Sequence, residues 1–218
     1  MRHYHNKFND QKFEMKSIRP FNVGWVEQKL ESDVMKFLWN IIDIGGPSAR
    51  NTLAGNIHES CLLVDKDNWF FNNVLTNTIE FYADEFGDPM GEIPIEGKLK
   101  YSLVDIWVNY QKQTEFNPVH FHRGVFSFVV WMKVPTAFEE QRKLHIASDV
   151  NSATISNFEI WYKDILGGDV AYRYEMSPHS EGTMLLFPSK LNHAVYPFYN
   201  CDEDRVSISG NIMVELDE

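Results

Sequence analysis

The second half of the chain alternates apolar and polar residues with a period of two, and this pattern limits the fold more than any other feature. After Pro94, eight short runs alternate in this way, and turn-forming residues separate them. Such alternation is typical of β-strands that bury one face. The runs are residues 98–110, 125–134, 143–147, 154–163, 170–175, 182–187, 193–198 and 205–215. We therefore predict a β-sandwich, jelly roll or barrel.

Two helical patterns precede the alternating part. In residues 25–43 the apolar positions follow the 3.6-residue period, and Gly45-Gly46-Pro47 ends the pattern. A second pattern runs from about residue 68 to residue 86, with Asp67 as its expected N-cap. Both helices need an apolar surface to cover, and a sheet offers one. We therefore predict helices that pack on the face of the β core.

Length and composition fit a single domain over residues 1–218. A chain of 218 residues can bury a sizeable core, and 14% aromatic residues suit pleated sheets. We expect three parts: an N-terminal arm (1–20), a helical support region (21–97) and the β core (98–218).

Acidic residues dominate the charge of the chain. Lys and Arg total 20 against 31 Asp and Glu, and a net charge of −11 argues against a general role in gripping nucleic acid phosphates. Residues 1–20 carry a local basic excess, and we expect them to be loosely ordered. Cys61 and Cys201 show no metal-site spacing, and no apolar run is long enough to span a membrane. We expect a cytoplasmic protein that does not bind membranes.

Two histidines separated by one residue form the first candidate site. His120 and His122 would project from the same face of a strand, while Phe121 would point into the opposite layer. His193 opens a later strand, after a turn marked by Pro188. Three histidines from distant segments could hold a metal ion. The alternative is that they bond to sheet carbonyls or lie in solvent.

Arg205 and Ser207 share one face of the last alternating run. Together they offer a guanidinium and a hydroxyl to a carboxylate. The alternative is that Arg205 forms an exposed ion pair with Asp202 or Asp204. Asn109 lies on the face of its run that could point into the mouth of the sandwich, or its side chain could bond to the backbone.

In order and spacing, these residues resemble the iron(II)- and 2-oxoglutarate-dependent dioxygenases, and most closely the small oxygenases of tailed bacteriophages of marine hosts. The matching segments are residues 107–111, 115–122, 126–135, 182–188, His193 and residues 205–209. The resemblance implies a double-stranded β-helix, a cupin-like jelly roll, for the core.

The resemblance implies His120, His122 and His193 as the iron ligands. His122 stands where most of the superfamily has Asp or Glu. Three neutral imidazoles should change metal affinity and selectivity, because such a set also suits zinc or copper. We consider Glu115 or Asp105 as a source of the missing carboxylate from a neighbouring strand.

The resemblance also implies a cosubstrate site. Arg205 and Ser207 would hold the distal carboxylate of 2-oxoglutarate, with Asn109 as a further contact. Such enzymes use O₂ to convert 2-oxoglutarate to succinate and CO₂ while they oxidise a substrate, usually by hydroxylation. We therefore predict an oxygenase of this type, whose unknown substrate is a protein side chain or small metabolite rather than nucleic acid. The chain could form a homodimer.

Two other functions remain open from the residues alone. Three histidines can equally hold zinc with an activated water, as in a hydratase or hydrolase, but Arg205 and Ser207 then have no role. A non-catalytic jelly-roll binding module, whose histidines bind no metal, is the third hypothesis.

Overall fold

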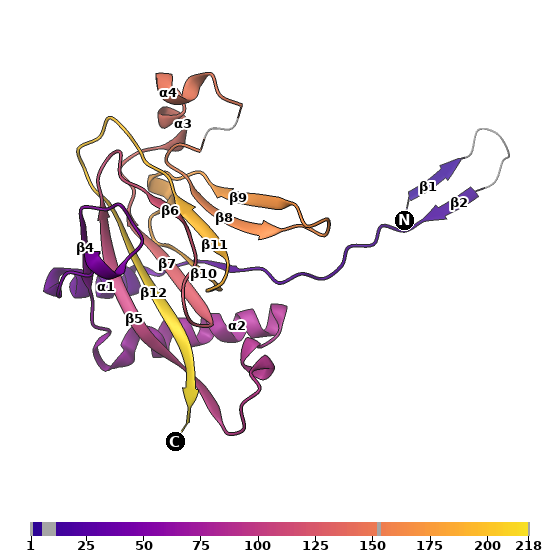
Figure 1. The fold of residues 1–218 in the computed structure, drawn as a ribbon, viewed down its shortest axis with the longest axis horizontal. Helices are drawn as coiled ribbons and strands as arrows, with labels where there is room; N and C mark the ends of the chain where they lie inside the picture. The colour runs from indigo at the N-terminus through magenta and orange to yellow at the C-terminus, as the bar shows by residue number, and fades with distance from the viewer. Residues whose placement is uncertain (1, 6–11, 152–153, 218) are drawn as a thin grey trace.

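The computed structural model describes residues 2–5, 12–151 and 154–217, and most of its strands belong to two antiparallel sheets (Figure 1). The strands of the larger sheet are β3 (Val26–Lys29), β4 (Glu59–Leu62), β5 (Leu99–Gln111), β7 (Phe126–Lys133), β10 (Thr183–Pro188) and β12 (Arg205–Leu216). Those of the smaller sheet are β6 (Asn117–His120), β8 (Phe158–Lys163), β9 (Asp169–Tyr174) and β11 (Asn192–Val195). The order is β3-β10-β7-β12-β5-β4 in the larger sheet and β6-β11-β8-β9 in the smaller one. The mainly β prediction is confirmed.

Two long helices, α1 (Ser32–Ile44) and α2 (Thr76–Phe86), pack on one face of the larger sheet (Figure 1). A π-helical turn, η3 (Phe71–Leu75), leads into α2. The short elements are α3 (Phe138–Gln141), α4 (His145–Ser148), η1 (Arg50–Thr52), η2 (Lys66–Asn68), η4 (Pro89–Glu92) and η5 (Pro178–Ser180). The helices therefore cover the sheet, as expected from their apolar faces.

Strand β7 is buried along almost its whole length because both of its faces are covered. Phe128 and Val130 belong to the cluster that includes α1 and α2. Val129 and Trp131 belong to a second cluster, shared with residues of β8. Since alternate side chains of a strand point to opposite faces, β7 contributes to both apolar layers.

The expected start of the first helix is wrong. Residues 26–29 form strand β3, which pairs with β10, and the helix begins only at Ser32. Val26 and Leu30 are both buried, and their spacing of four residues matches the helical period. This spacing predicts a helix, although Val26 lies in the strand. The edge of β10 offers backbone hydrogen bonds to this segment, which periodicity within the segment does not reveal.

Two further expectations are corrected by the structure. Asp65 rather than Asp67 caps the second helical segment, since its carboxylate accepts from the backbone N–H groups of Phe70 (2.8 Å) and Phe71 (2.9 Å). Asp67 instead has a left-handed backbone with φ of 58°. Residues 143–147 are not a strand, since α4 begins at His145, and β4, of four residues, was not foreseen. The strand expected to carry His120 and His122 is β6, which ends at His120.

The N-terminal arm contains a hairpin that the sequence did not reveal. Strands β1 (Arg2–His5) and β2 (Lys12–Met15) pair antiparallel and lie away from the two larger sheets (Figure 1). Within the described part of the chain, no helix is long and apolar enough to cross a membrane.

Gly210, in the middle of β12, provides a test of this packing. A Cβ atom there would lie 2.5 Å from the Phe128 ring and 2.6 Å from the carbonyl oxygen of Asp105. We expect Gly210→Ala to lower the free energy of unfolding by about 1–3 kcal/mol, as overpacking does. Urea denaturation measures the change. The control Gly91→Ala, where no atom lies within 4 Å of the added Cβ, should stay within ~0.5 kcal/mol of wild type. Equal stability of the two variants would contradict this packing.

Candidate functional site

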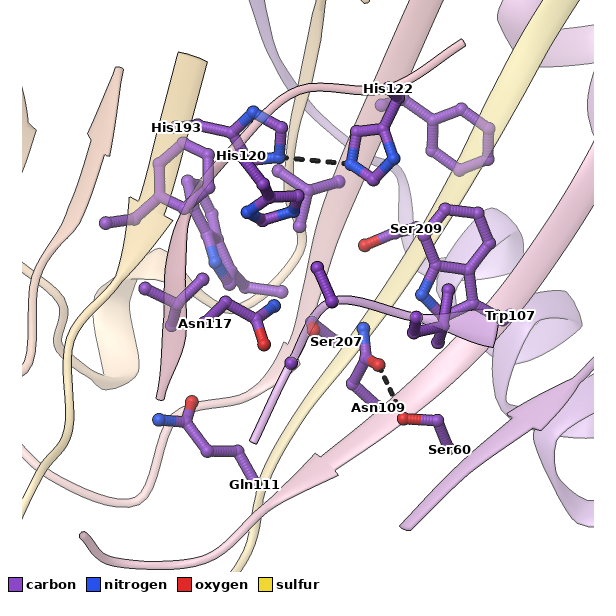
Figure 2. Close-up of a pocket in the computed structure, with 18 of the residues that line it drawn as sticks. Ser60, Trp107, Asn109, Gln111, Asn117, His120, His122, His193, Ser207 and Ser209 are labelled. Carbon is purple, nitrogen blue, oxygen red and sulfur yellow. Dashed lines mark hydrogen bonds between the residues drawn. The ribbon is translucent and has the colours of Figure 1, made fainter. Parts of the chain in front are cut away.

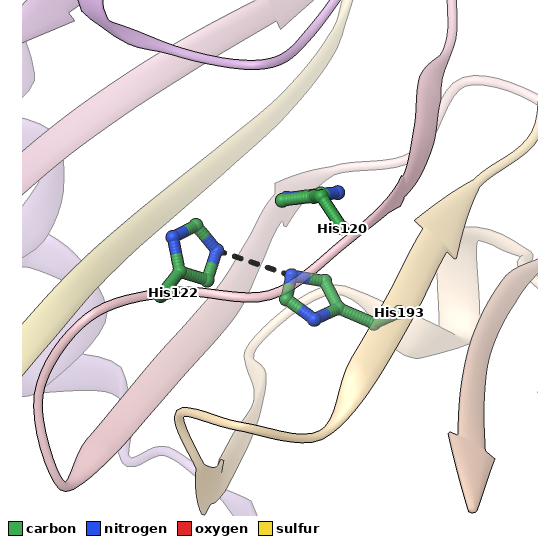
Figure 3. A group of neighbouring side chains, drawn as sticks. All are labelled: His120, His122 and His193. Atoms are coloured by element: carbon green, nitrogen blue, oxygen red, sulfur yellow. Dashed lines mark hydrogen bonds between the residues drawn. The ribbon is translucent and has the colours of Figure 1, made fainter.

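Three histidines from two strands and a loop converge at one end of the smaller sheet (Figure 3). His120 is the last residue of β6 and pairs directly with His193 on β11. His122 follows two residues after His120, and its Nε2 atom lies 3.1 Å from Nε2 of His193. The three side chains offer ligand atoms that lie within 4.8 Å of one another. The structure thus brings the three predicted histidines together.

The reason for the position of His122 differs from the expected one. His122 lies beyond the end of β6, so strand alternation does not orient it. Instead, its backbone N–H donates to the carbonyl of Ser189 (2.9 Å), and its ring packs near Trp107. Phe121 does not enter an apolar layer: it is 58% exposed, with the Lys190 ammonium 5.2 Å from its ring centre.

Backbone carbonyls fix the orientation of two of the imidazoles. Nδ1 of His120 lies 2.7 Å from the carbonyl oxygen of Pro118, and Nδ1 of His193 lies 3.1 Å from that of Leu191. A carbonyl can only accept, so both Nδ1 atoms carry the proton and each Nε2 keeps a free lone pair. This is the arrangement in which a histidine binds a metal ion.

All three imidazoles are held in the neutral form. Burial, with a smaller contribution from the neighbouring histidines, lowers the pKa of His193 to about 3 and that of His122 to about 4. Burial also lowers the pKa of His120. At neutral pH the site therefore presents lone pairs to a divalent cation without competition from protons.

No carboxylate completes this group among the described residues. Glu115 accepts from the backbone N–H of Lys112 (2.8 Å) and lies 3.2 Å from Nδ1 of His58. Asp105 has an exposed side chain. The suggestion that either residue supplies the missing ligand is therefore wrong for this structure. The donor set fits a divalent metal that accepts three neutral nitrogens, such as iron or zinc.

Arg205 is buried, and no acidic side chain of the described residues pairs with it. It is 3% exposed, and its Nη2 donates to Oγ (2.7 Å) and to the carbonyl (3.3 Å) of Ser156. The Phe198 ring centre lies 4.9 Å from the guanidinium carbon. Within the described residues, Arg205 forms no ion pair and its Nε has no hydrogen-bond partner, so the exposed bridge to Asp202 or Asp204 is not present. Burial lowers the pKa of the guanidinium to about 9, which leaves it charged at neutral pH.

Arg205 and the three histidines line the same pocket. Figure 2 shows the histidines in this pocket. Asn109, Ser207 and Gln111 add polar groups to it, while Trp107, Trp131, Phe158 and Phe187 form apolar walls. Ser60 on β4 donates to Oδ1 of Asn109 (2.8 Å), so the partner of this amide is a side chain and not the backbone. Figure 2 shows the amide nitrogen of Asn109 on the side away from Ser60.

Sequence reasoning missed several residues of this pocket. Ser60, Gln111 and Asn117 line it, and Asn117 Oδ1 is buried without a hydrogen-bond partner in the described chain. Gly55 lies against this amide, since a Cβ atom at Gly55 would come within 1.9 Å of Asn117 Oδ1. Asn117 lies on β6, the strand that carries His120, so its place near the histidines could have been inferred from the sequence. Ser60 reaches the pocket only because β4 pairs with β5, which the sequence does not indicate.

Known proteins show the same architecture. Residues 105–211 match the family model described as "Putative 2OG-Fe(II) oxygenase". The fold is similar to an oxidoreductase of the 2OG-Fe(II) oxygenase family from Burkholderia pseudomallei, with 12% identity, a TM-score of 0.54, and coverage of 87% of this chain and 84% of that chain. It is also similar to a Pseudomonas putida prolyl-4-hydroxylase, with 13% identity, a TM-score of 0.50, and coverage of 86% and 91%. These likenesses support the jelly-roll fold. No curated protein matches the sequence.

The low pKa of His193 predicts how the metal-free protein responds to acid. In the unfolded chain this imidazole binds a proton near its ordinary pKa of about 6.5, whereas in the folded protein it does so only near pH 3. The unfolded state therefore binds more protons between these values, and stability falls as the pH drops from about 6.5. In urea unfolding of EDTA-treated protein, His193→Asn should flatten this fall between about pH 6.5 and 4.

The matched control is His145→Asn, because His145 is exposed and lies outside the pocket. This variant should keep the pH dependence of the wild type. An unchanged slope in His193→Asn would contradict the neutral, buried state of His193.

Proposed function

We propose that this chain is an oxidoreductase of the 2OG-Fe(II) oxygenase superfamily, which uses Fe(II), 2-oxoglutarate and O₂ and hydroxylates a substrate while 2-oxoglutarate is converted to succinate and CO₂. One observation carries the proposal: a buried arginine, which has no acidic partner among the described residues, shares a pocket with three converging histidines. A cation on one side and metal-ligand lone pairs on the other suit a small molecule with an anionic end and a chelating end.

His120, His122 and His193 would hold the iron. The carbonyls of Pro118 and Leu191 keep the Nε2 lone pairs of His120 and His193 available, and burial keeps both rings neutral. Bound iron would supply the activation of O₂, which is the oxidant: one oxygen atom would go into the succinate formed as 2-oxoglutarate is oxidised and decarboxylated, and the other would go to the substrate. The chain itself contributes the ligands, the orientation and a pocket with apolar walls.

Arg205, Ser207 and Asn109 would bind 2-oxoglutarate. Ser207 pairs with Asn109 across β12 and β5, and both line the pocket together with Arg205. The guanidinium would take the distal carboxylate, because no described acidic side chain neutralises it. Ser207 would add a hydroxyl donor, and Asn109 would donate through the amide nitrogen that its bond to Ser60 leaves free.

A zinc hydratase or hydrolase is the second candidate, because three neutral imidazoles are also a zinc site. Two observations favour the oxygenase. The family match covers both ends of the proposed site, since residues 105–211 include the histidines and Arg205. A zinc enzyme of this kind would also have no use for a buried, unpaired guanidinium, which is costly to retain.

The primary substrate is proposed by class only. The net charge of −11 favours a protein side chain or a small metabolite over nucleic acid. The resemblance to oxygenases of tailed bacteriophages, a cytoplasmic location and a homodimeric state stay predictions.

Turnover of 2-oxoglutarate tests the proposed function. With Fe(II), ascorbate and air, the protein should form succinate from 2-oxoglutarate even without its substrate, at a slow rate. Arg205→Met should raise the KM for 2-oxoglutarate by on the order of 100-fold, because it removes one partner of a buried charge pair, and should leave Fe(II) affinity within about threefold. Arg142→Met, at an exposed position, serves as the control. Absence of succinate together with absence of any thermal shift by 2-oxoglutarate would contradict the proposal.

The third imidazole predicts an unusual metal preference. His122→Asp would restore a hard, anionic ligand, and we expect the ratio of zinc to Fe(II) affinity to fall severalfold relative to wild type. His122→Ala, which removes the ligand without adding charge, should weaken both metals. Competition titrations under anaerobic conditions measure the two affinities. A zinc-to-iron ratio unchanged in His122→Asp would show that His122 does not bind the metal.

A further inference from the structure

One residue outside the predicted site holds one end of the Arg205 guanidinium. Ser156, just before β8, accepts from Nη2 of Arg205 through its hydroxyl (2.7 Å) and through its carbonyl (3.3 Å). Among the described residues, the other polar partner of this guanidinium is the carbonyl of Tyr196, which accepts from Nη1 at 3.5 Å. Nε has no hydrogen-bond partner among the described residues. Ser156 is therefore the main polar anchor of this guanidinium.

Ser156 is itself fixed in an uncommon conformation. It is fully buried, and its φ of 61° lies in the left-handed region that residues other than glycine seldom adopt. Backbone hydrogen bonds hold it on both sides: Ser156 N–H donates to the carbonyl of Pro197 (2.8 Å), and Tyr196 N–H donates to that of Asn157 (2.9 Å). Such strain persists where the surrounding structure imposes it, often at functional sites.

The chemistry of the anchor matters as much as its position. A serine accepts a hydrogen bond from a guanidinium but carries no charge, whereas an Asp or Glu in its place would neutralise the cation. The Phe198 ring beside the guanidinium also adds no negative charge. Neutral groups therefore orient Arg205 while its full positive charge and its Nε donor stay available.

We propose that Ser156 is a positioning residue for the cosubstrate: it orients Arg205 so that the uncompensated guanidinium receives the distal carboxylate of 2-oxoglutarate. This inference rests on the proposed function. Ser156 acts through Arg205, so its loss should weaken the recognition of that one carboxylate and leave the metal site intact.

A pair of ligands isolates this effect. 2-Oxopentanoate has the keto acid group and chain length of 2-oxoglutarate but lacks the distal carboxylate. Calorimetric titration of the Fe(II)-loaded protein without O₂ should show that wild type binds 2-oxoglutarate more tightly than 2-oxopentanoate. Ser156→Ala should weaken 2-oxoglutarate about tenfold, the order expected for a lost hydrogen bond to a charged group, and change 2-oxopentanoate by less than about twofold.

Two further variants separate positioning from folding. Ser156→Gly removes the same hydroxyl but relieves the left-handed backbone, so it should show the same loss of 2-oxoglutarate affinity without a loss of thermal stability. Ser102→Ala removes a buried hydroxyl that has no partner in the described chain, and it should bind both ligands as wild type does. In both Ser156 variants, Fe(II) affinity and kcat at saturating 2-oxoglutarate should stay close to the wild-type values.

The outcomes distinguish the inference from the proposed function. Equal weakening of both ligands would assign Ser156 a purely structural role and overturn the inference. Unchanged 2-oxoglutarate affinity in both Ser156 variants would overturn it as well, while wild-type binding would still support the proposed function. A wild-type protein that binds neither ligand would overturn the proposed function and the inference with it.

Discussion

Strands β7, β12 and β5 of the larger sheet contribute residues both to the apolar cluster on the helix side and to the pocket, and the site depends on which residues they turn to each side. On β12, Val206 and Ile208 belong to the apolar cluster under the helices, while Arg205 and Ser207 line the pocket. On β5, Val108 likewise faces the helices and Asn109 the pocket. Because the side-chain period is two, a register shift by one residue would place the guanidinium against the helices. The apolar face that fixes the fold thus also fixes the position of the polar groups.

The polar face of these strands lowers the stability of the folded protein, because it buries the charged guanidinium of Arg205. A buried guanidinium without an anion is unfavourable, and neutral acceptors such as Ser156 and Tyr196 satisfy only part of its donors. A ligand that brings a carboxylate to Arg205 relieves this cost and therefore stabilises the folded state. An acidic side chain paired with Arg205 would lower the free-energy cost of burying the guanidinium, but it would also neutralise the charge that is proposed to bind the carboxylate.

The sequence predicts the positions of site residues that follow from a local pattern, such as alternation along one strand. It does not predict the positions of residues that reach the site through pairing between strands far apart in the chain. The resemblance to a known family implied that His120, His193 and Arg205 would share one site, and the structure places all three in one pocket. His122 reaches this group through a loop and not through a strand. Ser156 gives no such signal: it lies in a turn with a left-handed backbone and meets Arg205 only through the folding of the two sheets. Strand β3 was mistaken for helix for the same reason, because its partner β10 lies far along the chain.

Charge connects the two halves of the pocket. Three neutral imidazoles would leave the two positive charges of a bound metal uncompensated, and Arg205 adds a third without an acidic partner among the described residues. A dianionic keto acid is attracted by both centres at once, and in a pocket with apolar walls these attractions are weakly screened. The bound metal therefore increases the affinity of the pocket for the keto acid, and the keto acid increases the affinity for the metal, since such coupling is reciprocal. In an enzyme with a carboxylate ligand the metal would be partly neutralised in advance, so this coupling should be stronger with His122 than with an acidic residue in its place.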